Sequence, residues 1–185
     1  TITLSSAGVL SDADLTGVTN FDTLVLADGA NTIVLGAEFE ESGIATLTGS
    51  TGADTVTYGS GVTTAVTHAL GSSAGDDTIS AEAATGAFTF TITEDGIDAS
   101  DTITGSSTAS DTLTITFDDD VSDVITATEM SGVTKVDTIK TASNAVGSLA
   151  LSDNNTVSGV LAIDAVLNTG DAFTLDASAE NDGTI

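Results

Sequence analysis

Closely spaced aspartates are the residues of this chain best suited to chemistry, because several of them fall within four residues of another carboxylate. Calcium takes about six to eight oxygen ligands in flexible geometry, and proteins supply them from carboxylates and backbone carbonyls. Since Asp and Asn also mark turns, we expect these carboxylates at the bends of the chain. The sequence predicts calcium ligands among Asp54, Asp76, Asp77, Asp95, Asp98, Asp101, Asp118, Asp119, Asp120 and Asp123.

The same aspartates have a second interpretation that involves no metal. A carboxylate at a turn can accept hydrogen bonds from nearby backbone amides, and an Asp before Thr at the start of a strand can do so without any cation. If successive turns stack in register, Asp77, Asp98 and Asp101 would approach one another along one corner. Both interpretations stay open at this point.

The charge balance excludes several partners. The 185 residues include 28 Asp and Glu against two Lys and Arg, which gives a formal net charge of −26. Binding of nucleic acid rests on cations that neutralise phosphates, so it is not expected, and neither is attraction to anionic lipid. The chain has no Cys for a disulfide or thiolate site, and no apolar run long enough to span a membrane.

A triplet of Asp or Asn, then Thr, then an aliphatic residue recurs along the chain. The steps between successive triplets are 23, 23, 24 and 22 residues. Internal periods of this length indicate solenoids or propellers. The series reads Asn31-Thr32-Ile33, Asp54-Thr55-Val56, Asp77-Thr78-Ile79, Asp101-Thr102-Ile103 and, with one change, Asp123-Val124-Ile125.

A second series of apolar and polar alternation lies half a period away, as in FTFTIT at 88–93 and TLTITF at 112–117. Alternation with β-branched residues is typical of half-buried strands. The stretch DLTGVTNFDTL at 14–24 also parallels EMSGVTKVDTI at 129–139, five periods later. We therefore expect an all-β protein, a parallel β-solenoid of about eight coils forming one repeat domain over 1–185; a β-sandwich remains the alternative.

Three stretches match part of the calcium-binding nonapeptide G-G-x-G-x-D-x-U-x. They are GSTGADTV at 49–56, and the stretches that contain Gly75, Asp77 and Ile79, and Gly96, Asp101 and Ile103. The chain thus resembles the RTX family of secreted bacterial proteins and, more broadly, acidic Thr-rich surface-layer proteins and adhesins. The resemblance implies an exported, calcium-responsive surface protein. True arrays repeat every nine residues, whereas these stretches lie about 23 apart.

Catalysis has little support in the sequence, and we expect no enzyme. The single histidine, His68, alternates with Val66 and Leu70, which favours a packing role. Two Lys cannot polarise the carboxylates of an acidic polysaccharide, and Trp, the usual sugar-stacking residue, is absent. Threonine ladders occur in ice-binding solenoids, but the Thr-x-Thr pairs are not expected to recur on one fixed strand of every coil, so this function is not expected either.

Both ends of the chain resemble open coils: TITL at 1–4 reads as a strand, and NDGTI at 181–185 resembles the start of another coil. Uncovered strand edges invite pairing with another chain. We therefore expect either a fragment of a longer protein or a unit that forms a homo-oligomer or polymer through its ends. The expected function is a calcium-stabilised structural part of a bacterial extracellular or cell-surface assembly; the alternative is an adhesin segment that binds a glycan or host protein.

Overall fold

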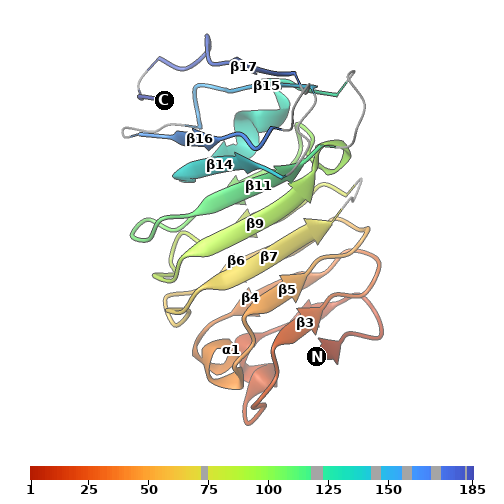
Figure 1. Ribbon diagram of the computed structural model, residues 1–185. Helices are drawn as coiled ribbons and strands as arrows, with labels where there is room; N and C mark the ends of the chain where they lie inside the picture. Colours follow the sequence, from red (N-terminus) through yellow and green to blue (C-terminus); the bar gives the residue numbers. More distant parts are fainter. Residues whose placement is uncertain (72–74, 118–122, 143–146, 156–159, 168–171, 182) are drawn as a thin grey trace.

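Parallel strands stack on one another along the chain in the computed structural model, which forms a β-solenoid (Figure 1). The structure describes residues 1–71, 75–117, 123–142, 147–155, 160–167, 172–181 and 183–185. All the pairings between its named strands are parallel, as the solenoid interpretation predicts and a sandwich of antiparallel sheets does not. The predicted β-solenoid is confirmed, with about seven turns where eight coils were expected.

The longest sheet, here sheet A, contributes one strand to each turn and lies at the front of Figure 1. Its neighbours in space are the strands of successive turns, so its order follows the sequence. In that order it contains β1 (Ile2–Thr3), β3 (Thr23–Val25), β5 (Thr46–Thr48), β7 (Val66–Gly71), β9 (Phe88–Thr93), β11 (Thr112–Thr116), β14 (Thr138–Thr141) and β16 (Ala162–Asp164).

Sheet B forms a second wall of the solenoid and has six described strands. It contains β2 (Val9–Leu10), β4 (Thr32–Leu35), β6 (Thr55–Tyr58), β8 (Thr78–Ser80), β10 (Thr102–Thr104) and β13 (Val133–Thr134). Four of these strands begin directly after the recurrent Asp or Asn of the triplet series, so each of those triplets marks the corner that leads into sheet B.

The fifth triplet does not continue that series. β12 (Val124–Ile125) instead joins β15 (Gly147–Ala150) and β17 (Phe173–Asp176) in a separate sheet C, while β13 takes the place beside β10. Thr134 therefore pairs with Thr104, 30 residues earlier. The turn is longer because it accommodates both β12 and a 3₁₀ helix, η3 (Glu129–Gly132), before it returns to sheet B.

The core is a column of inward side chains supplied by each turn. Alternation places one face of every strand inside, and parallel pairing in register stacks equivalent residues. Sheet A supplies Leu24, Leu47, His68, Phe90, Leu113 and Ile139, and sheet B supplies Ile33, Val56, Ile79, Ile103 and Val133, all of them buried. Apart from His68, these residues belong to one continuous apolar cluster.

The described helices are short and lie in the bends. They are η1 (Asp12–Leu15), α1 (Ala37–Ser42), η2 (Glu94–Gly96) and η3. The carboxylate of Asp12 accepts hydrogen bonds from the amides of Gly36, Glu38 and Phe39, at 2.7, 3.1 and 2.9 Å, and so caps the start of α1. None of the helices in the described part of the chain is long and apolar enough to cross a membrane.

The long self-match in the sequence corresponds to repeated structure. Its two copies place β3 and β14 five strands apart in sheet A, as the five periods between them predict. Asn20 and Lys135 occupy the same place in the two copies, and they are the two described non-glycine residues with positive φ, at 64° and 55°. The match therefore extends from side-chain pattern to backbone conformation.

Candidate functional site at the acidic corners

A ladder of side chains runs along the corner that leads into sheet B. The amide of Asn31 donates to Asp54 Oδ1 at 3.0 Å, the amide of Asp54 donates to Asp77 Oδ1 at 2.8 Å, and the amide of Asp77 donates to Asp101 Oδ1 at 2.8 Å. Each carboxylate therefore binds the turn before its own. We call Asn31, Asp54, Asp77 and Asp101 the corner ladder.

The other carboxylate oxygen of two ladder residues closes the turn to which that residue belongs. Asp54 Oδ2 accepts the amide of Ser50 at 3.2 Å, and Asp101 Oδ2 accepts the amide of Asp98 at 2.7 Å. One side chain thus fixes both the shape of a bend and its distance from the neighbouring bend. The expected hydrogen-bonding role of these aspartates is confirmed, and it requires no metal.

Stacking places like charges close together in a buried position. Asp54, Asp77 and Asp101 are only 2%, 4% and 2% exposed. Burial raises the pKa of Asp77 to about 7; the amide of Asp54 opposes this shift, and the charges of Asp54, Asp101 and Asp76 add to it. Burial also raises the pKa of Asp101. A proton or a cation at this corner would relieve the repulsion.

Two stacked glycines explain why the corner sequence contains GSTGADTV. A Cβ at Gly52 would lie 2.3 Å from the carbonyl carbon of Gly29, and one at Gly75 would lie 2.5 Å from that of Gly52. Only a residue without a side chain allows the bends of adjacent turns to approach this closely. Gly52 and Gly75, which match glycines of the calcium nonapeptide, are therefore required by turn-to-turn contact.

The remaining predicted metal ligands do not all lie on this corner. Asp98 adjoins it and accepts the amide of Ser100 at 2.6 Å, so the expected approach of Asp77, Asp98 and Asp101 is observed. Asp76 is exposed beside Asp77, and Asp95 is exposed within η2. Asp123 immediately precedes β12 of sheet C and so lies outside the corner ladder.

Asp118, Asp119 and Asp120 lie outside the described residues. Among the residues that the structure does describe, no group of three or more His, Asp or Glu side chains is arranged to hold a metal ion. The calcium site therefore stays a prediction. What the geometry does establish is a buried line of carboxylates whose oxygens bind backbone amides.

A second ladder, at the corner leading into sheet A, was not singled out from the sequence. Asp111 Oδ1 accepts the amide of Phe88 at 2.7 Å, its Oδ2 accepts the amide of Ser106, and its own amide donates to Asp137 Oδ2 at 2.8 Å. Asp111 is fully buried, and burial raises its pKa. The signal was present, since Asp111-Thr112-Leu113 and Asp137-Thr138-Ile139 contain the same triplet.

Asn155 repeats this arrangement without a charge. Its Oδ1 accepts the amide of Ser152 at 2.7 Å, and its Nδ2 donates to the carbonyls of Met130 and Val133 at 2.8 Å each. Asn155-Thr156-Val157 also fits the triplet, but it lies off the 23-residue step and was missed. Asn155 and Asn31 show that an amide can occupy such a corner as well as a carboxylate.

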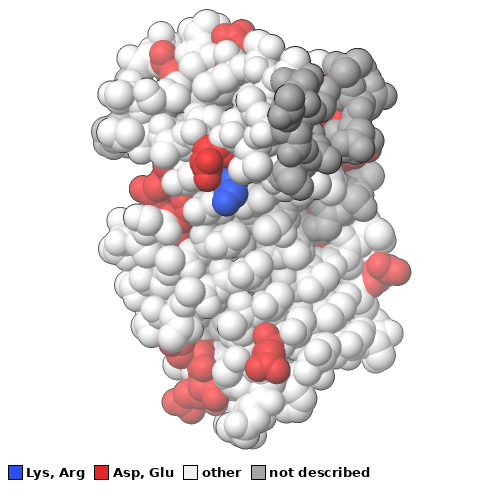
Figure 2. Space-filling model, in the orientation of Figure 1, with Lys and Arg blue, Asp and Glu red and all other residues white. Residues whose placement is uncertain are grey.

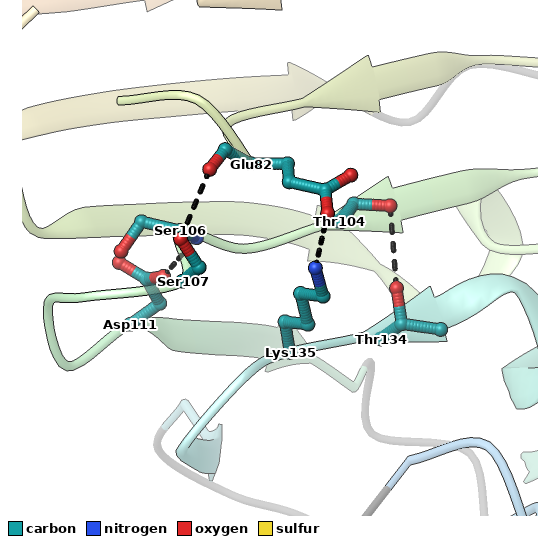
Figure 3. A network of polar contacts seen from close by, with 7 residues as sticks. All are labelled: Glu82, Thr104, Ser106, Ser107, Asp111, Thr134 and Lys135. Atoms are coloured by element: carbon teal, nitrogen blue, oxygen red, sulfur yellow. Dashed lines mark hydrogen bonds and ion pairs between the residues drawn. The ribbon is translucent and has the colours of Figure 1, made fainter. Parts of the chain in front are cut away.

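The two lysines make ion pairs on the surface. Lys135 reaches back over the neighbouring turn to Glu82 (Figure 3), and Lys140 lies 3.7 Å from Asp164. In the same network the hydroxyl of Ser107 donates to the carbonyl of Glu82, and that of Thr134 donates to Thr104. These contacts tie successive turns together on the outside of the solenoid.

His68 is in the core, as its alternation pattern predicts. Its Nδ1 lies 3.1 Å from the hydroxyl of Tyr58, and both side chains are buried. Burial lowers the pKa of His68 to about 3 and raises that of Tyr58, so both are neutral at physiological pH. This arrangement satisfies a buried polar pair and packs it among Phe39, Phe88 and Phe90.

Comparison with protein-family models, with curated proteins and with solved structures finds no match to this chain.

Proposed function

We propose that this chain is a structural segment of a bacterial extracellular or cell-surface assembly, such as a surface layer, fibre or filament. In this proposal calcium stabilises it, and further coils add to it in register. The observation that carries the proposal is the exposure of apolar side chains on the end turns. Ile2, Leu10 and Ile163 point into the core of the end turns but are only partly buried. The residues that pair with them in the neighbouring turns, Leu24, Ile33 and Ile139, are fully buried.

The backbone at the ends points to the same role. Among the described strands, β1 and β16 are the outer strands of sheet A, each paired with one strand, and Thr184 bridges Val160 just before β16. A solenoid turn buries its apolar face only when another turn stacks on it. A coil with the same register, from a longer chain or from a neighbouring copy, would cover these strands and the apolar side chains beside them.

Calcium would stabilise the protein by reducing the repulsion between its carboxylates. The corner ladder aligns buried carboxylates, and the chain as a whole carries a formal charge of −26. At the turn after β9, Glu94 Oε2 is buried and accepts no hydrogen bond in the described structure, and Asp95 and Asp98 follow it. A divalent cation near these oxygens would offset repulsion that no lysine in the described structure relieves.

Electron microscopy and sedimentation over a range of protein concentrations test the assembly. We expect filaments or sheets that grow with concentration in calcium and shorten in chelator. Ile2→Glu puts a charge on the inward side of the outer strand β1 and should reduce assembly, whereas Val34→Glu puts the same charge on the outward face of β4 and should not. A chain that stays monomeric at every concentration in calcium would contradict self-association and favour a segment that binds a partner through its sides.

A further inference from the structure

The outward side chains of sheet A form a straight column of threonines. Parallel pairing aligns one threonine of each strand with that of the next, from β3 to β14, even though the turns between them differ in length. Its members are Thr23, Thr46, Thr67, Thr89, Thr112 and Thr138. Variable turn length hides this register of single threonines in the sequence. The Thr-x-Thr pairs themselves do not recur in every turn, as expected: β5, β9 and β11 contain one, and β3, β7 and β14 do not.

A second column runs beside the first, two residues further along each strand. It consists of Val25, Thr48, Ala69, Thr91 and Thr114, from β3 to β11. Neighbouring strands lie ~4.8 Å apart, and alternate residues of one strand lie ~6.7 Å apart. The two columns therefore make a two-dimensional grid of methyl and hydroxyl groups whose spacing is fixed by the backbone ladder. We call this grid the threonine face.

The threonine face is free of charge in a very acidic chain. From β3 to β11 neither column contains any of the 28 Asp and Glu residues. Charged side chains first appear beyond it, where Lys140 and Asp164 pair with each other. Figure 2, with sheet A toward the viewer, shows few coloured atoms over the middle strands and the acidic ones mainly toward the margins. Acidic groups repel anionic partners, so this face suits a neutral one.

The shape and repeat of the face narrow the choice of neutral partner. A single small ligand contacts one or two strands, whereas the grid continues over five. A crystalline glycan is usually held by aromatic rings, but the chain has no Trp and its one Tyr is buried. Ice presents water oxygens at regular spacings of a similar size. Threonine hydroxyls can occupy such positions, while the methyl groups between them hold ordered water.

We propose that the threonine face binds the surface of ice. The continuous core beneath the face keeps the grid rigid. Binding therefore costs little conformational entropy, because the threonine side chains are already ordered. This binding uses the side of the solenoid, goes beyond the structural role proposed above and does not depend on assembly through the ends.

Ice affinity and thermal hysteresis of the intact chain test the proposal. Wild-type protein should enter a slowly growing ice hemisphere and lower the freezing point of a seed crystal, whereas serum albumin at equal concentration should do neither. Thr89→Tyr places a bulky ring in the middle of the face and should lower the activity by about tenfold, the factor that corresponds to ~1.4 kcal/mol of lost contact energy. Tyrosine is a good strand former, so the fold should persist.

Sheet B has a similar outward column, Thr32, Thr55, Thr78 and Thr102, so the matched control is taken from a bend instead. Thr51→Tyr is that control, because Thr51 is exposed between β5 and β6 and belongs to no column. It should leave ice activity unchanged. Circular dichroism melting establishes that both variants are folded, and Thr48→Tyr replaces Thr89→Tyr if the latter is not. The proposal is overturned if the wild type behaves like albumin, or if Thr51→Tyr reduces the activity as much as a folded variant of the threonine face.

Discussion

At the scale of single residues, each aspartate of the corner ladder has one favourable and one unfavourable effect on stability. The carboxylates of Asp54, Asp77 and Asp101 satisfy backbone amides of adjacent turns, and buried amides are costly to leave unpaired. The same stacking brings like charges together in a buried place. The uncharged Oδ1 of Asn31 accepts the amide of Gly8 at 3.4 Å in the same way, so the acceptor of such a contact need not be an aspartate.

Asp77→Asn should therefore stabilise the protein at pH 8. Burial in the folded protein raises the pKa of Asp77 to about 7, above its pKa in the unfolded chain. The protonated side chain therefore contributes its full stability at a pH below the pKa of the unfolded chain, and this stability is lost as the pH rises through 7. Asparagine keeps the acceptor for the amide of Asp54 and removes the charge. We expect a gain of about 1–3 kcal/mol at pH 8 and little change at pH 4, measured by urea unfolding in chelator.

Asp95→Asn is the control for this prediction, because Asp95 is an exposed carboxylate outside the ladder. It removes the same charge and should change the free energy of unfolding by less than Asp77→Asn. Wild-type protein should also become more stable between pH 8 and pH 5. If the wild-type protein instead became less stable as the pH was lowered from 8 to 5, Asp77 would be charged in the folded state at no cost in free energy.

At the scale of elements, the contact between adjacent turns determines which residues a corner can hold. Gly52→Ala should destabilise the protein by about 2–4 kcal/mol, because the added Cβ would overlap the backbone of Gly29. Gly8→Ala is the matched control: a Cβ there meets nothing within 4 Å. Urea unfolding of both variants measures the difference. Equal stability would mean that the bends of adjacent turns can separate at little cost.

The sequence predicts the strands well and the path between them less well. Alternation identifies β9 and β11, and the triplets identify the corners that lead into sheet B, because each pattern reflects local burial and local turn chemistry. Asp123-Val124-Ile125 looks like another such corner, yet β12 joins sheet C. A triplet specifies a bend followed by a strand, but which neighbour that strand pairs with depends on the length of the whole turn.

The sequence predicted part of the candidate site: it placed the corner ladder but missed the equivalent residues at other corners. Position in the repeat was enough to place Asp54, Asp77 and Asp101 on one corner. Asp111 and Asn155 were missed because one belongs to the other series and the other lies off the 23-residue step. The choice between calcium ligand and amide acceptor could not be made from residue type, since both uses need the same oxygen atoms at the same bends.

At the scale of the whole molecule, a continuous apolar core opposes the self-repulsion of 28 acidic residues. Two lysines in surface ion pairs offset little of that charge, since exposed pairs contribute about 0–1 kcal/mol each. Charge repulsion of this kind is screened by simple salt. The melting temperature should therefore rise with added sodium chloride, whether or not the protein binds calcium.

Calcium binding should be visible above that general effect. At matched ionic strength, millimolar calcium chloride should raise the melting temperature more than sodium chloride does, because a ligand bound only by the folded state adds RT ln(1 + [L]/Kd) to its stability. Magnesium is the second comparison, since it prefers six oxygens in rigid geometry and gives up its water reluctantly. If calcium and sodium chloride give the same rise, the acidic bends act as amide acceptors and solvated surface. If calcium alone adds to the melting temperature, the Asp95→Asn variant should lose part of that increase and Asp28→Asn, at a different exposed bend, should keep it.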